Sequence, residues 1–319
     1  MRDRIGPIDL WQNRAMQPTK YIWLDGDFVD WDDATVHVLS HGLHYGTGAF
    51  EGIRAYETDD GPAVFRLTEH IDRLSRACKA AGIPISWSVD DLVAASKQLF
   101  AANKLTAGYI RPLVFYGTGS MGLNPAGATV HTMIATWEWG AYLGEEGVAN
   151  GIRVKVSSWR RIGHDSLMPN AKLTGGYVNS VQAKQEALNG GYDEALMLNA
   201  EGFVAEGSGE NLFLVRKGVV TTPPVSAGVL EGLTRDAVIT LLRDDGYDVV
   251  EAPVIRTDLY YADELFFTGT AAEVTPIREV DDRIVGGGKP GPVTRRAQEL
   301  FLQLVTGQNE RHGDWLEYI

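Results

Sequence analysis

The sequence predicts an α+β fold with two domains. Expected strands and helices are mixed without the strict alternation of a doubly wound sheet. Pairs of apolar runs joined by short turn sequences are frequent, which favours mostly antiparallel sheets. A polar, Gly-rich stretch near the middle of the 319-residue chain is typical of a linker. We therefore expect an N-terminal extension, a small domain, the linker and a large domain, at residues 1–19, 20–139, 140–147 and 148–319.

The first expected element is a β-hairpin. Asp25-Gly26 separates two apolar runs, and a type I′ turn needs the positive φ angles that this pair tolerates. Residues 35–38 are expected to form another short strand. The Gly-rich stretch 40–56 is expected to begin as a loop that carries Tyr45 and Phe50 to a ligand.

Two helices are expected next. Apolar residues recur at helical spacing from Thr68, and Gly82 and Pro84 end that run. Ser88, with Asp91 three residues later, has the pattern of a capping box at the start of the second helix. Local signals therefore mark one boundary of each helix.

The next stretches are predicted to be two strands and a loop. The strands cover residues 109–116 and 130–137, and Pro112 inside the first predicts an edge position or a bulge. The Gly-rich stretch 117–122 matches the letters of a dinucleotide-binding fingerprint, which must open a helix. Residues 123–127 have a loop sequence instead, so we reject nucleotide binding.

The second half has equally clear local signals. It is expected to contain a strand at 152–156, a helix at 177–188, hairpins at 199–202 and 217–218, a buried strand at 265–267 and a helix at 293–305. A Gly-containing turn at 230–235 leads into one further helix, with Thr234 as the expected cap. Free N–H groups and the helix dipole would make this turn a seat for a phosphate. An ordinary capped helix is the competing interpretation.

Composition excludes several classes of function. The net charge of −13 argues against nucleic acid or an anionic membrane as a partner. Cys78 is the only cysteine, and the seven histidines are scattered, so we expect neither a disulfide within the chain nor a metal site. Without a signal peptide or an apolar run of about 18 residues, the expected location is cytoplasmic.

The candidate chemistry centres on residues 170–177, where Lys172 stands among small residues ahead of two glycines and Tyr177. A lysine that points into a cleft can form a Schiff base, because desolvation and nearby cations lower its pKa from about 10.4. Glu206, in a Gly-rich bend before the apolar run 212–215, suits a carboxylate held at a fixed site. A lysine and a carboxylate partner for a pyridinium nitrogen are what pyridoxal phosphate chemistry requires. The competing interpretation is a surface lysine in a loop.

Several stretches, taken in order, closely resemble the branched-chain amino acid aminotransferases, which have the class IV aminotransferase fold. They are Ser40–Arg54, Tyr109–Leu113, Lys172 with Tyr177, Glu206–Phe213, Gly232–Arg235 and Gly269–Glu273. The resemblance covers nearly all of residues 20–319. It implies a ping-pong enzyme that exchanges amino groups between L-leucine, L-isoleucine or L-valine and 2-oxoglutarate. It also implies that pyridoxal 5'-phosphate binds at the interface of the two domains.

The resemblance assigns roles around the cofactor. Lys172 resembles the catalytic residue that binds the cofactor covalently and moves the proton during transfer. Glu206 resembles the partner of the ring nitrogen, and Tyr177 resembles the residue that bonds the ring O3′. The remaining cofactor contacts that the resemblance implies are Arg73, Leu233, Thr234 and Thr270 around the phosphate and Leu230 against the ring.

The resemblance also assigns roles around the substrate. It places the α-carboxylate near Thr270, Ala271 and Tyr109, and the distal carboxylate of glutamate at Arg111. Phe50, Tyr142 and Tyr177 would line an apolar pocket, and Tyr45, Met121 and Leu123 would enter it from a partner subunit. Self-association is therefore implied, as a homodimer or a higher oligomer such as a hexamer.

Three alternatives stay open from the sequence. A D-amino-acid or (R)-amine transaminase of the same fold would share the cofactor site. A lyase of the aminodeoxychorismate type would release pyruvate, and a non-catalytic pyridoxal phosphate binder would turn nothing over. Tyr109, Arg111 and residues 269–271 favour an L-amino acid with a branched apolar side chain.

Overall fold

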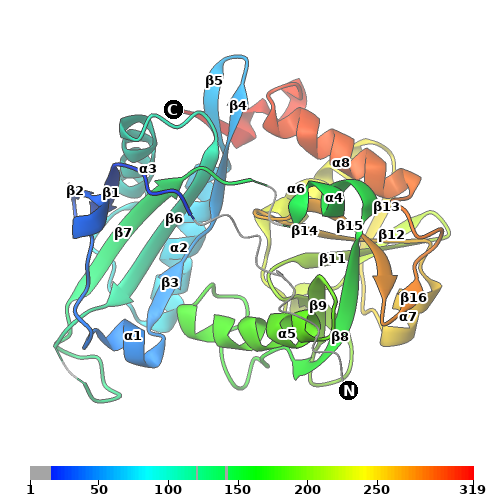
Figure 1. Cartoon of the computed structure of the whole chain (residues 1–319), viewed down its shortest axis with the longest axis horizontal. Helices are drawn as coiled ribbons and strands as arrows, with labels where there is room; N and C mark the ends of the chain where they lie inside the picture. Colours follow the sequence, from blue (N-terminus) through cyan, green and yellow to red (C-terminus); the bar gives the residue numbers. More distant parts are fainter. Residues whose placement is uncertain (1–15, 120, 141–142) are drawn as a thin grey trace, which may run out of the picture.

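Two β-sheets organise the chain. The computed structural model describes residues 16–119, 121–140 and 143–319. Figure 1 shows the first sheet on the left and the second on the right. Strands of the first sheet come from residues 21–137 and 316–318, and those of the second come from residues 152–284. Helices lie against both sheets, so the predicted α+β fold is confirmed.

The first sheet is antiparallel throughout its described pairs. In spatial order it contains β17 (Leu316–Tyr318), β5 (Gly61–Phe65), β4 (Ile53–Thr58), β6 (Gly108–Tyr116), β7 (Val130–Trp137), β1 (Tyr21–Leu24) and β2 (Asp27–Asp30), with β3 (Gly48–Phe50) also beside β6. The predicted hairpin joins β1 to β2, and Asp25 and Gly26 have φ angles of 51° and 109°. These positive values are those that a type I′ turn requires.

Two long helices and a shared apolar core cover one face of this sheet. They are α2 (Leu67–Ala81) and α3 (Val89–Ala102), and their buried side chains pack with Ile53, Ile110 and Ile134 of the strands. The predicted capping box is confirmed, because Ser88 and Asp91 each accept a hydrogen bond from the other's backbone N–H. The opposite face of the sheet is left to carry the candidate site.

Two expectations for the first half are wrong. Residues 35–38 have no regular secondary structure, and Val36 and Val38 are exposed instead of packing on the sheet as strand residues would. The stretch expected to be a loop contains the short helix α1 (His41–Tyr45). Gly46 ends this helix in the left-handed conformation, with a φ of 65°, so this glycine acts as a helix terminator and does not prevent the helix.

Pro112 lies in the interior of the sheet, so the predicted edge position is wrong. Its carbonyl accepts a hydrogen bond from the Glu51 N–H at 3.0 Å. The N and C=O of a strand residue point to the same neighbour, so the absent N–H of Pro112 also faces Glu51. Glu51 and Gly52 interrupt the neighbouring strand between β3 and β4, which is where a proline can be accommodated.

The second sheet is mixed. Its spatial order is β10 (Val204–Gly207), β9 (Glu194–Leu198), β8 (Ile152–Arg160), β15 (Glu273–Val280), β14 (Glu264–Gly269), β11 (Asn211–Arg216), β12 (Val219–Thr222) and β13 (Asp248–Glu251), with β16 (Arg283–Ile284) beside β15. Strand β8 runs parallel to β9 and β15, and β12 runs parallel to β13. Mostly antiparallel pairing therefore describes the first sheet better than the second.

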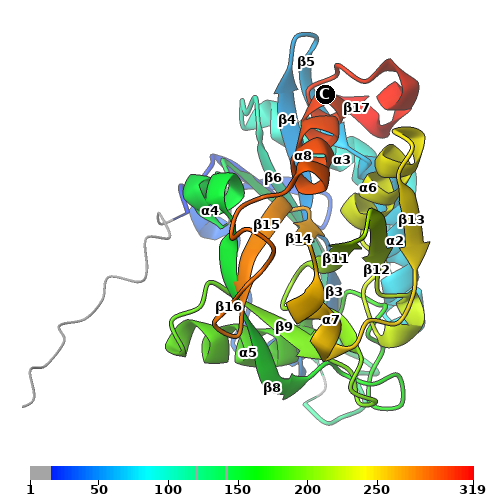
Figure 2. The ribbon, with the colours of Figure 1, turned by 90° about the vertical axis from the view of Figure 1, so that its right-hand side faces the viewer.

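Helices cover both faces of the second sheet. They are α4 (Gly144–Asn150), α5 (Tyr177–Asn189), α6 (Leu233–Asp244), α7 (Arg256–Tyr261) and α8 (Pro292–Val305), with 3-10 turns η1 (Trp31–Asp33), η2 (Thr174–Gly176), η3 (Val225–Ala227) and η4 (Glu310–Trp315) along the chain. The core under α6 and α8 includes Phe65 and Leu316 of the first sheet, and Figure 2 shows β5 and β17 beside α8. The two halves of the molecule thus share a core.

The predicted domain limits stay a prediction. Helix α4 occupies the second half of the predicted linker, and residues 141–142 lie outside the described residues. Among the helices that the structure describes, none has both the length and the apolar composition needed to cross a membrane.

Candidate active site

Strand β3 holds the lysine stretch in place. The Phe50 N–H donates to the Lys172 carbonyl at 3.0 Å, and Ala49 pairs with Leu173 as an isolated antiparallel bridge. Gly175 approaches Gly46 so closely that a Cβ on Gly46 would lie 2.7 Å from the Gly175 Cα. The two glycines thus let the lysine stretch, which leads into the second half of the chain, lie against the first sheet.

The side chains of Lys172 and Tyr177 are in direct contact. The short turn η2 leads directly into α5, whose first residue is Tyr177. The Lys172 Nζ donates to the Tyr177 Oη at 2.5 Å. Phe50 completes the group, because its ring lies 4.9 Å below the Lys172 Nζ and 4.8 Å from the ring of Tyr177.

Glu206 is a buried carboxylate with several partners. Its Oε1 pairs with the Arg161 Nε at 2.8 Å, and its Oε2 accepts from the Asn211 Nδ2 and the Leu230 N–H at 3.0 Å each. Burial raises the pKa of Glu206, and Arg161 and the Leu230 N–H oppose that rise. The contacts fix one orientation of the carboxylate, as the sequence led us to expect of Glu206.

Arg73 is held by a second buried carboxylate that the sequence did not single out. Glu51 is fully buried, and its two oxygens accept from the Arg73 Nε at 2.7 Å and Nη2 at 2.8 Å. His70 Nδ1 lies 2.8 Å from the Glu51 Oε2. Burial alone would raise the pKa of Glu51, but Arg73 and His70 hold that pKa well below its ordinary value.

The first turn of α6 lies beside Arg73, whose Nη1 donates to the Glu231 carbonyl at 2.6 Å. The cap of this helix is Gly232 and not Thr234, which is a buried residue inside the first turn. No side chain bonds to the cap, and the first backbone bond of the helix runs from Asp236 to Gly232. The N–H groups of Leu233 and Thr234 therefore have no partner within the helix, as a phosphate seat requires.

The predicted substrate residues gather on the free face of the first sheet. Tyr109 and Trp137 are opposite each other in β6 and β7, and Ala271 packs against them. Thr270 belongs to the same short turn between β14 and β15 as Ala271. The backbone turn at Thr270 and Ala271 therefore reaches the sheet face that carries Tyr109.

Arg111 stands on the same face inside a box of aromatic rings. Its guanidinium carbon lies 5.0 Å from the Phe50 ring centre, 5.3 Å from that of Tyr109 and 6.0 Å from that of Trp137. The Arg111 Nε is buried and has no hydrogen-bond partner among the described residues. No described carboxylate forms an ion pair with Arg111 either, so this cation is available to a ligand.

The residues predicted to act on a partner subunit are at the surface of the single chain. Tyr45, Met121 and Leu123 are 42%, 38% and 85% exposed. The Tyr45 Oη donates to the Met121 carbonyl at 2.8 Å, so α1 and the loop between β6 and β7 form one surface feature. Tyr142, which was predicted to line the substrate pocket, lies outside the described residues.

Comparison with known proteins identifies the fold family. The family model for amino-transferase class IV matches residues 48–280. The chain belongs to this family. It is 51% identical to the branched-chain-amino-acid aminotransferase of Pseudomonas aeruginosa, over 92% of this chain and 95% of that protein. It is 47% identical to the enzyme of the same name from Escherichia coli strain K12, over 94% of this chain and 97% of that protein.

Solved class IV aminotransferases have the same overall structure. The Escherichia coli branched-chain amino acid aminotransferase superposes with a TM-score of 0.92 at 47% identity, covering 94% of this chain and 99% of that chain. A second branched-chain amino acid aminotransferase, from T.th. and complexed with N-(5'-phosphopyridoxyl)-L-glutamate, has a TM-score of 0.91 at 47% identity, covering 95% and 99%.

Sequence reasoning missed three residues that hold the site of this class IV aminotransferase together. Glu51 and Asn211 lie inside stretches that carry the family resemblance, so a polar residue there was a usable signal. Arg161 follows Arg160 at the end of β8, and two adjacent arginines are typical of a solvent-exposed surface. Its partner Glu206 is 45 positions away, and only the fold brings the two together.

Proposed function

We propose that this chain is a branched-chain amino acid aminotransferase that uses pyridoxal 5'-phosphate. It would exchange amino groups between L-leucine, L-isoleucine or L-valine and 2-oxoglutarate. The contact between Lys172 and Tyr177, with the buried Glu206 in the same site, is the observation that carries this proposal. Relatives that are 47–51% identical carry the name of this activity, which supports it further.

The described residues have the chemistry that the cofactor needs. Lys172 offers an amine, Glu206 offers a fixed carboxylate for a ring nitrogen, and Tyr177 offers a phenol for the ring oxygen. Arg73 and the uncapped first turn of α6 offer N–H donors to a phosphate. When bound, pyridoxal 5'-phosphate supplies an electron sink that makes the Cα proton of an amino acid removable.

Lys172 then moves the proton. Its Nζ would accept the Cα proton of the substrate and donate it again as the amino group is transferred, and one such round with each substrate would make the cycle ping-pong. Tyr177 keeps the Nζ at the correct place through the 2.5 Å contact. Arg161 holds the Glu206 carboxylate in one orientation, in which it would face the ring nitrogen of the cofactor, and the cation favours the ionised form of that carboxylate.

The substrate pocket has to accept two kinds of side chain. The aromatic faces of Phe50 and Trp137 suit a branched apolar side chain, and each methylene that they enclose contributes about 1–3 kcal/mol of discrimination. Arg111, which no described carboxylate neutralises, suits the distal carboxylate of glutamate or 2-oxoglutarate. When an apolar side chain is bound, the aromatic rings around Arg111 stabilise its positive charge through cation–π contacts.

Arg111→Ala should separate the two substrates. Loss of the guanidinium should lower kcat/KM for L-glutamate by at least about a hundredfold, which corresponds to the roughly 3 kcal/mol of a charge-assisted hydrogen bond. The value for L-leucine should fall by less than about tenfold, because only ring packing changes. Stopped-flow half-reactions measure both values. Equal losses with the two substrates would exclude Arg111 from this role.

We also propose that the enzyme works as a homodimer or a higher oligomer in the cytoplasm. Val36, Val38, Leu39 and Leu43 are exposed apolar residues, and Val36 and Leu43 border a cavity of about 360 Å³ beside α1. Burying them against a second copy would remove a large apolar surface from water. A chain with one cysteine also suits a reducing compartment.

Single half-reactions test the proposed activity. The purified enzyme with cofactor is mixed with L-leucine, L-glutamate, D-alanine or (R)-1-phenylethylamine, and conversion to the pyridoxamine form is followed by absorbance. Fast conversion with L-leucine and L-glutamate alone is expected. Faster conversion with D-alanine or the (R)-amine would identify the other transaminases of this fold. Lys172→Ala should convert with none of them, and turnover by that variant would refute the role of Lys172.

A further inference from the structure

Arg66 is a buried cation in an unfavourable backbone conformation. It precedes α2, has a φ of 51° and is 8% exposed. A non-glycine residue in the left-handed region costs on the order of 1 kcal/mol. Its side chain also loses hydration, which an arginine recovers only through well-aligned partners. These costs are accepted where the side chain holds other groups in a required position.

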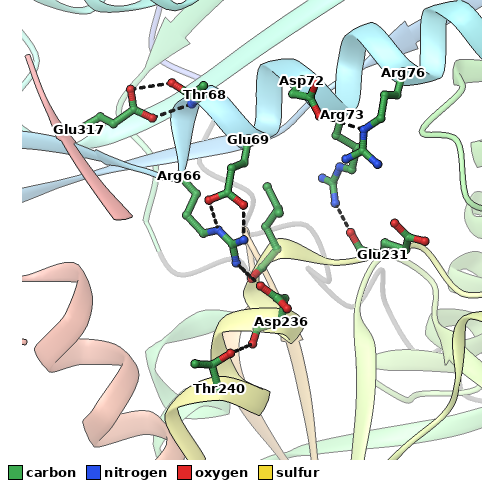
Figure 3. Close-up of polar contacts among 11 residues, drawn as sticks. Arg66, Thr68, Glu69, Asp72, Arg73, Arg76, Glu231, Asp236, Thr240 and Glu317 are labelled. Atoms are coloured by element: carbon green, nitrogen blue, oxygen red, sulfur yellow. Dashed lines mark hydrogen bonds and ion pairs between the residues drawn. The ribbon is translucent and has the colours of Figure 1, made fainter. Parts of the chain in front are cut away.

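The guanidinium of Arg66 joins three separate segments. Its Nε donates to the Glu69 Oε1 in the first turn of α2 at 2.7 Å, and its Nη2 contacts the other oxygen of Glu69. Its Nη1 donates to the Leu233 carbonyl at 3.1 Å and to the Asp236 Oδ2 at 2.6 Å, both in the first turn of α6. Its carbon lies 4.8 Å from the ring centre of Trp315, near the C-terminus. Figure 3 shows the contacts with Glu69 and Asp236.

Arg66, the N-terminal cap residue of α2, and Arg73 within α2 thus hold the same turn. Arg66 reaches residues 233 and 236, while Arg73 reaches the Glu231 carbonyl at 2.6 Å (Figure 3). The contacts of Arg66 and of Arg73 lie on either side of Gly232. Gly232 is the N-cap of α6 and has no side chain that could cap the helix. Without these contacts, the first turn of α6 would be free to fray, because its N–H groups have no intrahelical partners.

We propose that Arg66 is a positioning residue for the phosphate of the cofactor. By fixing Leu233 and Asp236, it keeps the N–H groups of Leu233 and Thr234 aimed at one point, although it does not itself touch the phosphate. This inference rests on the proposed cofactor. It adds a residue that lies outside the turn at 230–235 but supports phosphate binding there. Preorganised donors bind an anion more tightly because less conformational freedom is lost on binding.

If Arg66 and Asp236 affected the phosphate only through their charges, replacing Asp236 would change phosphate affinity in the opposite direction. Asp236 is an acid in the first turn of α6, so its charge repels a phosphate bound at the same turn. Replacing Asp236 with Asn removes that repulsion and should tighten phosphate binding if charge alone matters. If position matters more, the same substitution loosens the turn and weakens phosphate binding. The two explanations are therefore separable by one measurement.

The test compares two ligands that differ only by the phosphate. Cofactor-free protein is titrated with pyridoxal 5'-phosphate and with pyridoxal, and absorbance gives both dissociation constants. Asp236→Asn and Arg66→Lys are expected to weaken binding of pyridoxal 5'-phosphate about tenfold and to change pyridoxal binding by less than about twofold. A loss confined to the phosphorylated ligand is a result that general destabilisation would not give.

Glu69→Gln is the matched control, because Glu69 binds the same guanidinium but belongs to α2. It should change both dissociation constants by less than about twofold. Tighter binding by Asp236→Asn, equal losses for both ligands, or an equal effect of Glu69→Gln would each overturn the role of Arg66. Failure of the unaltered protein to bind pyridoxal 5'-phosphate would instead refute the proposed cofactor.

Discussion

At the residue scale, the site depends on charges that are buried in pairs. Glu51 illustrates this, since its carboxylate is fully enclosed and bonded to Arg73 and His70. A buried ion pair gains stability only while both partners are charged, and breaking it leaves an uncompensated charge. The same carboxylate that orients Arg73 is therefore a source of pH-dependent stability.

Glu51→Gln should destabilise the cofactor-free protein by about 3 kcal/mol at pH 7, because Arg73 loses its counter-ion. The folded pKa of Glu51 lies below the ordinary value of 4.5, so its stabilising effect is complete above pH 4.5. As the pH falls from 4.5 through the folded pKa, that contribution is lost in the native protein but not in the variant. Urea unfolding at pH 7 and at about pH 3 should therefore give a smaller difference at the lower pH.

The control for this prediction is Glu57→Gln, which changes an exposed carboxylate of β4. It should alter the free energy of unfolding by less than about 0.5 kcal/mol at either pH. A difference between native protein and Glu51→Gln that stays constant with pH would show that packing, and not charge, makes Glu51 important.

The residues of the site were predictable where their chemistry is local. Lys172 and Tyr177 are five positions apart, and one helix start brings them together. Glu51 and Arg161 could not be assigned in this way, because their partners Arg73 and Glu206 are 22 and 45 positions away. Ion pairs of this separation depend on the packing of two elements, which spacing does not specify.

At the element scale, the interruption between β3 and β4 shapes the site. Glu51 and Gly52 leave the strand just where Pro112 of β6 cannot donate a backbone hydrogen bond. The break turns Glu51 toward Arg73, and the missing side chain of Gly52 leaves space for Tyr109. A Cβ on Gly52 would lie 1.9 Å from the Tyr109 Oη and 2.8 Å from its ring carbon Cζ.

Gly52→Ala should displace the Tyr109 ring, which is buried and cannot swing into solvent. Overpacking of this kind costs about 1–3 kcal/mol of stability. Because the Tyr109 hydroxyl is proposed to bind the α-carboxylate, KM for L-leucine should also rise about tenfold. Thermal melts and steady-state kinetics measure the two effects.

A double variant identifies the clash. Adding Tyr109→Phe removes the hydroxyl, so Gly52→Ala/Tyr109→Phe should recover part of the lost melting temperature without recovering KM. Gly313→Ala, where a Cβ would meet nothing within 4 Å, should leave both quantities unchanged. If the double variant were less stable than Gly52→Ala, the clash would lie elsewhere.

Elements with strong local chemistry were predictable, and those set by neighbours were not. The hairpin turns at 25–26 and 217–218 have positive φ angles at both positions, which Asp25 and the two glycines favour. Residues 35–38 have the apolar alternation of a strand, but they form no strand, and Val36 and Val38 lie on the exposed surface. The position of Pro112 depended on a break in a different strand, which no property of its own stretch reveals.

At the scale of the whole molecule, the C-terminus ties the two halves together. Strand β17 adds to the first sheet next to β5, and Leu316 enters the core under α6 and α8. Glu317 accepts from the Thr68 N–H at 2.6 Å and from its hydroxyl at 3.0 Å, at the start of α2 (Figure 3). The first turn of α6 and strand β17 are thereby both held at the same end of α2, so the candidate site depends on contacts between distant parts of the sequence.

The complete site is proposed to need two chains, and mixing variants can detect this. Lys172→Ala lacks the amine, while Tyr45→Ala/Leu123→Ala lacks exposed side chains proposed to enter the partner's pocket. In a randomly mixed dimer population, one intact site forms in each hybrid, so about a quarter of the native activity should return. Activity is measured with L-leucine after the two variants are co-expressed.

Lys172→Ala mixed with Glu206→Ala is the decisive control, because both residues belong to the site of one chain. Every site in that hybrid has one defect, so no activity should return. Recovery in the first mixture alone would establish that α1 and the loop between β6 and β7 act in the partner's site. An activity in the first mixture no greater than the sum of its separate components would place the whole substrate pocket within one chain. The exposed apolar residues around α1 would then need another explanation.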